Sequence, residues 1–220
     1  MDLRSRTPRF NREQQRPIWP ALMMVMSAIS GCQSGVRRAD VPDVSPSAAA
    51  AAAVEQYDAD GNGELSHDEL AACPGILSVV AKYDKDNDGQ VTADEIAARI
   101  QYWRDAKVAI LSLPCIVTLD GAPLAGAEMK FVPERYLGES VLPASGTTDE
   151  RGYAEVAIAA DALPADMKGI HGVHCGTYKI QITHPTQQIP AKYNTATVLG
   201  HETSLDNHVL SPKQFALTSR

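Results

Sequence analysis

The sequence is poor in several features that mark common functional classes. Aromatic residues make up only 5% of the 220 residues, so few side chains can stack on sugar rings or nucleic-acid bases. The chain contains no G-x-S-x-G nucleophile elbow, no H-E-x-x-H zinc motif and no glycine-rich loop that would cradle phosphates. We therefore expect no enzymatic activity of these common classes.

Positive charge is scarce beyond the first few residues. The formal net charge is −7, whereas residues 1–16 carry +3 and residues 55–95 carry −9. Binding to a phosphate backbone requires clustered lysine and arginine, which the chain lacks after residue 16. A nucleic-acid partner is therefore not expected.

The longest apolar run, Ile18 to Ile29, follows the basic N-terminal stretch and is broken only by Pro20 and Ser27. It is too short to span a bilayer comfortably, and its basic flank is typical of a targeting segment. The string Ile29-Ser30-Gly31-Cys32 that ends it resembles the lipobox of bacterial lipoproteins.

The lipobox resemblance implies that residues 1–31 form a signal peptide and that Cys32 is the lipidated first residue of the mature protein. The alternative is an ordinary secretory signal that happens to contain a cysteine. Lipidation would tether the protein to a membrane of the bacterial cell envelope, on the periplasmic side or at the surface. Residues 32–47 are polar and contain proline, which predicts a flexible tether.

Two twelve-residue stretches carry the strongest functional signal. DADGNGELSHDE spans Asp58–Glu69, and DKDNDGQVTADE spans Asp84–Glu95. Each has acidic or amide side chains at positions 1, 3 and 5, glycine at position 6 and glutamate at position 12. Calcium takes six to eight oxygen ligands, and this spacing folds a short loop around one ion. Both stretches resemble EF-hand calcium loops, which implies two bound Ca²⁺ ions.

Each loop is predicted to bind its ion through side chains and one backbone carbonyl. The predicted ligands in the first loop are Asp58, Asp60, Asn62, Glu64 (carbonyl), Ser66 and Glu69. Those in the second loop are Asp84, Asp86, Asp88, Gln90 (carbonyl), Thr92 and Glu95. Gly63 and Gly89 occupy the sharp turn. Because the second loop offers four ligand carboxylates and the first only three, we expect tighter binding at the second.

The sequence around the loops predicts helices. The same apolar helical spacing precedes each first ligand, in Ala50, Ala53, Val54 and Tyr57 and again in Ile76, Val79, Val80 and Tyr83. The alanine run 48–53 should begin the first helix, and the last helix should run to about Ser112. Ser66 and Thr92 should cap the exiting helices, and the resemblance implies pairing of Leu65 with Val91. We assign residues 48–112 to an EF-hand pair.

Residues 113–220 change to alternating apolar and polar positions between turn signals. Strands are predicted at 115–119, 127–131, 153–159, 178–182, 195–199 and 214–217. This pattern predicts an α+β protein of several domains, in which a small all-α EF-hand pair precedes an all-β sandwich, prealbumin-like or Ig-like.

Three stretches of this region, VTLDGAPLAGAEMKFVP, GTTDERGYAEV and GTYKIQITHP, resemble the carboxypeptidase regulatory-like (transthyretin-related) domain. That family implies a structural or binding module without catalytic residues.

A second metal site is a weaker candidate. His171, His174 and Cys175 have metal-ligand side chains, and His184 or His201 could complete a zinc or copper site. The alternative is a loop of exposed histidines. Cys115 and Cys175 either pair in an oxidising compartment or, like Cys73, are small buried residues.

Together these features predict a calcium-binding, lipid-anchored envelope protein with a structural or binding role. The alternative is a calcium-dependent docking module for a protein partner or an envelope polymer, as in dockerin-like assemblies.

Overall fold

The computed structural model describes residues 41–207 and 211–220. The described residues belong to one compact unit. The predicted signal peptide and Cys32 lie outside the described residues. Within the described part, no helix is both long enough and apolar enough to cross a membrane.

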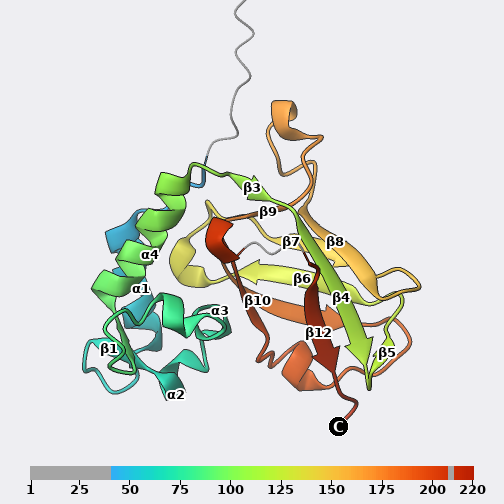
Figure 1. Cartoon of the computed structure of the whole chain (residues 1–220), viewed down its shortest axis with the longest axis horizontal. Coiled ribbons are helices and arrows are strands. Elements are labelled where there is room, and N and C mark those ends of the chain that lie inside the picture. Colours follow the sequence, from blue (N-terminus) through green and yellow to red (C-terminus); the bar gives the residue numbers. More distant parts are fainter. Residues whose placement is uncertain (1–40, 208–210) are drawn as a thin grey trace, which may run out of the picture. The chain divides into compact units, whose positions relative to one another are not determined.

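Short helices carry the two loops (Figure 1). They are α1 (Pro46–Tyr57), α2 (His67–Leu70), α3 (Pro74–Leu77) and α4 (Ala93–Ala106), with a 3₁₀ turn η1 (Val80–Lys82). The alanine run forms α1, as predicted, and α1 packs against α4. Strands β1 (Glu64–Ser66) and β2 (Gln90–Thr92) pair antiparallel with Leu65 opposite Val91, which confirms the pairing implied by the EF-hand resemblance.

The segment that enters the second loop differs from the prediction of one apolar helix face. It is split into α3 and η1, so Ile76 and Val80 lie in separate elements. The Ser78 hydroxyl donates to the Gly75 carbonyl at 2.8 Å, a local bond that competes with continued helix.

The last helix is also shorter than predicted, because α4 ends at Ala106. Lys107 adopts a left-handed conformation, and Ile110–Leu111 then form β3, which pairs with β9 (Val173–His174). Pro114 lies inside β4.

The remaining strands form one sheet in the order β11-β10-β6-β7-β8-β4-β12, with β5 paired to β4. Their bounds are β4 Leu113–Leu119, β5 Ala122–Pro123, β6 Glu128–Pro133, β7 Ala144–Thr147, β8 Tyr153–Ile158, β10 Gly176–Thr183, β11 Gly200–Thr203 and β12 Lys213–Leu217. All pairs are antiparallel except β12 with β4.

The sheet curls so that its two halves face each other across a core. Phe131 on β6 and Phe215 on β12 have ring centroids 6.2 Å apart, although β7, β8 and β4 separate their strands in the sheet. The predicted α+β class is confirmed, and the β region is a half-barrel built like a sandwich from a single curled sheet.

Five of the six predicted strands are found, and the exception is 195–199. There the backbone folds back on the 3₁₀ turn η4 (Ala191–Tyr193), since the Val198 amide donates to the Lys192 carbonyl at 3.0 Å. The strand forms immediately afterwards as β11, at the sheet edge.

The helices and the sheet share one hydrophobic core. Tyr57 at the end of α1 meets Tyr136 edge-on at 6.5 Å, and α3 packs against β10 and β11. Val44, in the segment predicted as a tether, is buried, and its carbonyl accepts from Arg104 at 2.6 Å. The described end of that segment is therefore packed on α4.

Candidate calcium loops

The first loop is shaped by backbone amides that donate to its acidic side chains. Asp58 accepts from the amides of Gly61 at 2.7 Å and Gly63 at 2.8 Å. Carboxylate oxygens of Asp58, Asp60 and Glu69 lie within 4.8 Å of one another. Three of the predicted ligands are therefore gathered around one point.

The second loop repeats this arrangement with one difference. Carboxylate oxygens of Asp84, Asp86 and Asp88 lie within 4.8 Å of one another, and Asp84 Oδ2 accepts from the Gly89 amide at 3.1 Å. Asp84 Oδ1 is buried and has no hydrogen-bond partner within residues 41–207 and 211–220. A buried carboxylate oxygen without a donor is costly, and a bound cation would satisfy it.

The glycine at position 6 of each loop occupies the sharp turn, as predicted. Gly63 has φ +90° and Gly89 has φ +88°, a backbone region that penalises any Cβ.

The last ligand position of each loop also lies in the first turn of the next helix. Ser66 and Glu69 form a capping box on α2, and Thr92 and Glu95 form one on α4, as predicted. Hydrogen bonds from the Ser66 amide and hydroxyl lower the pKa of Glu69 to about 2. Glu69 is thus anionic at neutral pH, as a calcium ligand must be.

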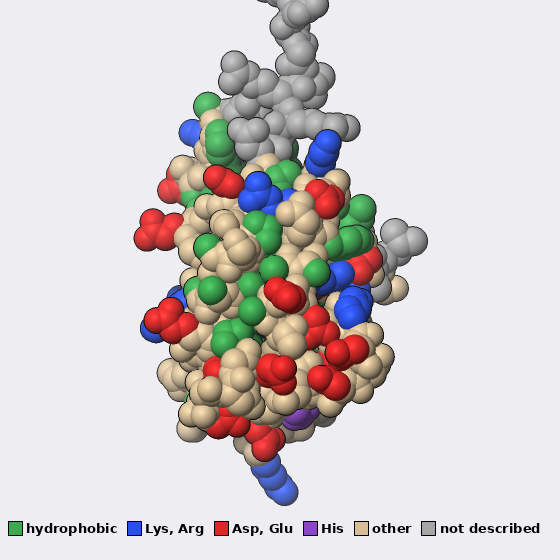
Figure 2. Space-filling model, turned by 90° about the vertical axis from the view of Figure 1, so that its left-hand side faces the viewer, with side chains coloured by type: hydrophobic (Ala, Val, Ile, Leu, Met, Phe, Trp, Pro, Cys, Tyr) green, Lys and Arg blue, Asp and Glu red, His purple; other side chains and the backbone are tan. Residues whose placement is uncertain are grey.

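Glu64 and Gln90, which are predicted to give carbonyl ligands, lie on the paired strands β1 and β2 that join the loops. The Gln90 side-chain amide donates to the Glu64 carboxylate at 2.9 Å, so the two loops are linked side by side. Acidic side chains gather on the lower part of the helical side of the molecule (Figure 2). The donor set consists of hard oxygen atoms, which suits Ca²⁺, and the predicted ligand residues would hold it.

Residues outside the loops hold their flanks. The sequence pattern predicted Tyr57 and Tyr83 as apolar helix positions, but it gave no sign of their partners in the sheet region. Tyr57, directly before Asp58, donates its hydroxyl to Glu134 Oε2 at 2.7 Å. Glu134 is only 1% exposed, and this burial raises its pKa, although the Lys179 ammonium lies 3.7 Å away. A tyrosine also directly precedes Asp84, and Tyr83 is fully buried.

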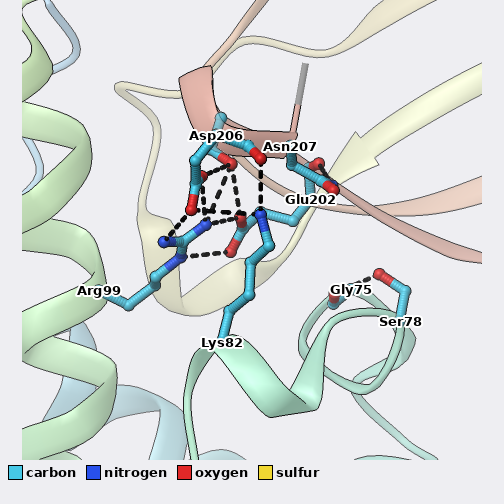
Figure 3. Close-up of polar contacts among 8 residues, drawn as sticks. Gly75, Ser78, Lys82, Arg99, Glu202, Asp206 and Asn207 are labelled. Carbon is cyan, nitrogen blue, oxygen red and sulfur yellow. Dashed lines mark hydrogen bonds and ion pairs between the residues drawn. The ribbon is translucent and has the colours of Figure 1, made fainter. Parts of the chain in front are cut away.

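A partly buried cluster of polar side chains, termed here the Arg99 cluster, joins α4 and η1 to the sheet edge (Figure 3). Its members are Lys82, Arg99, Glu202, Ser204 and Asp206. One residue in the sequence could have indicated this cluster: Arg99 places a charge on the apolar helix face that Ile96, Ile100 and Trp103 define. Its partners lie more than a hundred residues away, beyond the reach of periodicity.

The structure does not bring the predicted histidine site together. His171 is exposed, whereas His174 is buried and its Nδ1 accepts from the Leu142 amide at 3.2 Å. Burial lowers the pKa of His174 to about 4. The groups of three ligating side chains found among the described residues lie in the two calcium loops and include neither histidine.

The three described cysteines, Cys73, Cys115 and Cys175, are buried and carry free thiols. Burial raises the pKa of Cys115 to about 12 and that of Cys175 to about 11. The thiols are therefore protonated at neutral pH and chemically inert there.

Comparison with known proteins supports the loops alone. A family model described as EF hand matches residues 53–74 and 81–98, which contain the whole of both loops and part of their flanks. No curated protein matches the chain, and no solved structure matches it. The EF-hand match indicates calcium binding by this part of the chain.

Proposed function

We propose that the protein binds two calcium ions in its EF-hand loops and uses them to stiffen a helical unit that is packed on a half-barrel sheet. The observation that carries the proposal is the gathering of ligand carboxylates in both loops, with one buried Asp84 oxygen left without a donor. Repulsion among these carboxylates opposes the loop conformation, and a divalent cation would relieve it.

The proposed role is structural or binding, and not catalytic. The acidic side chains of the loops are exposed or half-buried, as expected of sites that exchange calcium with the surrounding medium. We expect an affinity of about 0.1–1 mM, the range of extracellular calcium modules. Calcium would then act as a constitutive part of the fold wherever its concentration is millimolar.

We propose further that the protein is a lipid-anchored component of a bacterial cell envelope. The support is the basic stretch, apolar run and Cys32 of the N-terminal sequence. Metabolic labelling with a radioactive fatty acid tests this point. The wild-type protein should be labelled and the Cys32→Ser variant should not, whereas labelling of both would refute the assignment.

Calcium titration calorimetry on residues 33–220, with melting curves with and without chelator, tests the main proposal. Two binding events and a raised melting temperature are expected. Absence of heat at millimolar calcium would show that the loops do not bind the ion.

A docking role is the alternative, and the same preparation separates it from a stiffening role. Calcium-dependent capture of an envelope protein or polymer by immobilised protein, lost in a Glu69→Gln/Glu95→Gln variant, would favour docking. Stabilisation by calcium without capture would favour stiffening.

A further inference from the structure

Both flanks of the second calcium loop reach the same segment of the sheet. Lys82 lies two residues before the first ligand, Asp84, and Arg99 lies four residues after the last ligand, Glu95. The segment that they contact is 202–206, which runs from the end of β11 into the 3₁₀ turn η5 (Leu205–Asn207).

Arg99 binds two carboxylates of this segment in forked geometry (Figure 3). Its Nε donates to Glu202 Oε2 at 3.1 Å, and its Nη2 donates to Oε1 of the same group. Its Nη1 and Nη2 donate to the two oxygens of Asp206 at 3.0 and 2.8 Å. Paired donation of this kind fixes both distance and orientation, which a single contact would not.

Lys82 completes the bridge from the other flank of the loop. Its ammonium lies 3.2 Å from Asp206 Oδ2 and donates to the Asp206 carbonyl at 3.0 Å. Asp206 therefore contacts the residues before and after the second loop at the same time. A shift of either flank would break contacts on this one residue.

The cluster is rigid because its centre is buried and paired. The side chains of Arg99 and Glu202 are 5% and 0% exposed, and the Ser204 hydroxyl lies 2.7 Å from the Glu202 carboxylate. A buried charge that loses its partner is strongly penalised, so the native arrangement has few competitors.

The first loop is held differently. Its entering helix is tied to the sheet through Tyr57 and Glu134, but its exiting helix α2 has only four residues. Within the described part of the chain, no hydrogen bond or ion pair joins an α2 side chain to the sheet. Hydrogen bonds and ion pairs of side chains thus tie the first loop to the sheet on one flank and the second loop on both.

We propose that segment 202–206 positions both flanks of the second loop through Lys82 and Arg99, so that calcium binding at this loop and docking of the segment favour each other. The inference rests on the proposed calcium binding. Thermodynamic linkage makes the coupling reciprocal: a docked segment raises the calcium affinity, and calcium holds the segment in place.

Asp206→Asn tests the coupling, because Asp206 lies outside both loops and its side chain is 37% exposed. Asp43→Asn is the matched control, since Asp43 also pairs with an arginine of α4, Arg104, but is 91% exposed and lies outside the cluster. Both changes remove one negative charge. Both variants are made in the full-length chain that carries Glu69→Gln. In calorimetry, Asp206→Asn should raise the dissociation constant for calcium about fivefold or more, whereas Asp43→Asn should raise it less than twofold.

Lys82→Gln separates coupling from simple electrostatics. Removal of a positive charge two residues from the loop should tighten calcium binding if only local charge matters. Coupling through segment 202–206 predicts weaker binding instead. Tighter or unchanged binding in Lys82→Gln would overturn the inference, and this variant decides the matter even if Asp206→Asn fails to fold.

Hydrogen exchange gives an independent readout at the other end of the coupling. Calcium should slow exchange of the amides of β11 and η5 in the Glu69→Gln chain, and Asp206→Asn should abolish most of that protection. If the Glu69→Gln chain binds calcium and the β11 amides show no calcium-dependent protection from exchange, the coupling is refuted, but the proposed calcium binding is not. If neither the Glu69→Gln chain nor the wild type binds calcium, the proposed function itself is refuted.

Discussion

At the scale of single residues, the twelfth position of each loop should dominate calcium affinity. Glu69 and Glu95 are the residues predicted to give two oxygens each, and both are already oriented by the cap of the following helix. We expect Glu95→Gln to weaken total binding more than Glu69→Gln, because the second loop has the larger number of ligand carboxylates. The loss at Glu95 should be about tenfold or more, and calorimetry measures it.

Glutamine has the size of glutamate and can form the same capping box, so the substitution should leave the following helix intact. Circular dichroism without calcium should therefore be the same for both variants. Equal effects of the two substitutions, or a larger effect at Glu69, would contradict the ranking.

The buried His174 predicts a specific response to acid. Its folded-state pKa of about 4 lies below the ordinary value of about 6.5, so the unfolded chain binds the extra proton first. The stability contributed by the neutral imidazole is present above pH 6.5 and is lost as the pH falls. Between pH 7 and pH 5 this loss amounts to about 2 kcal/mol.

His174→Asn should remove that part of the pH dependence, since asparagine keeps an acceptor for the Leu142 amide without titrating. Urea unfolding at pH 7 and pH 5 measures the difference. His171→Asn, three residues away at an exposed position, serves as control and should follow the wild type. A His174→Asn variant that loses as much stability as the wild type would refute the assignment.

At the scale of elements, the contact between α3 and the sheet edge depends on a close backbone approach. A Cβ on Gly200 of β11 would lie 1.9 Å from the Pro74 carbonyl oxygen of α3. Gly200→Ala should therefore destabilise the protein by about 1–3 kcal/mol, the usual cost of overpacking. Gly169→Ala is the control, because nothing lies within 4 Å of its added Cβ. Equal denaturation midpoints for the two variants would mean that α3 does not sit against β11.

Elements with a strong local signal could be predicted from the sequence, and elements that depend on distant contacts could not. The two loops, the capping residues Ser66 and Thr92 and the alternating strand β10 follow from spacing alone. The predicted end of α4 was wrong because β3 leaves the helix pattern to pair with β9, more than sixty residues away.

At the candidate site, the ligand residues could be predicted from the sequence, but the residues that hold the loop flanks could not. The predicted ligand residues of each loop all lie within one stretch of twelve residues, so the motif is local and can be recognised in the sequence. Glu134 and Glu202 act on the loops from strands and turns far along the chain, and a lone glutamate has no recognisable spacing. Only the topology of the sheet brings them to the loop flanks.

At the scale of the whole molecule, the shared core predicts that calcium stabilises the sheet as well as the helices. Residues from α1, α4 and the strands belong to one hydrophobic cluster, so neither part can lose its packing without exposing the other. We expect one cooperative melting transition, with and without calcium. At a hundredfold excess over its dissociation constant, each ion adds about 2.7 kcal/mol.

Such a gain corresponds to a rise of about 5–10 °C in melting temperature per ion for a unit of this size. Scanning calorimetry measures the number of transitions, and hydrogen exchange of β10 amides reports on the sheet directly. Calcium should slow exchange in both β10 and α4, and the Glu69→Gln/Glu95→Gln variant should show neither effect. Two separate transitions, of which only the one assigned to the helices responds to calcium, would show instead that the helical unit and the sheet unfold independently despite their common core.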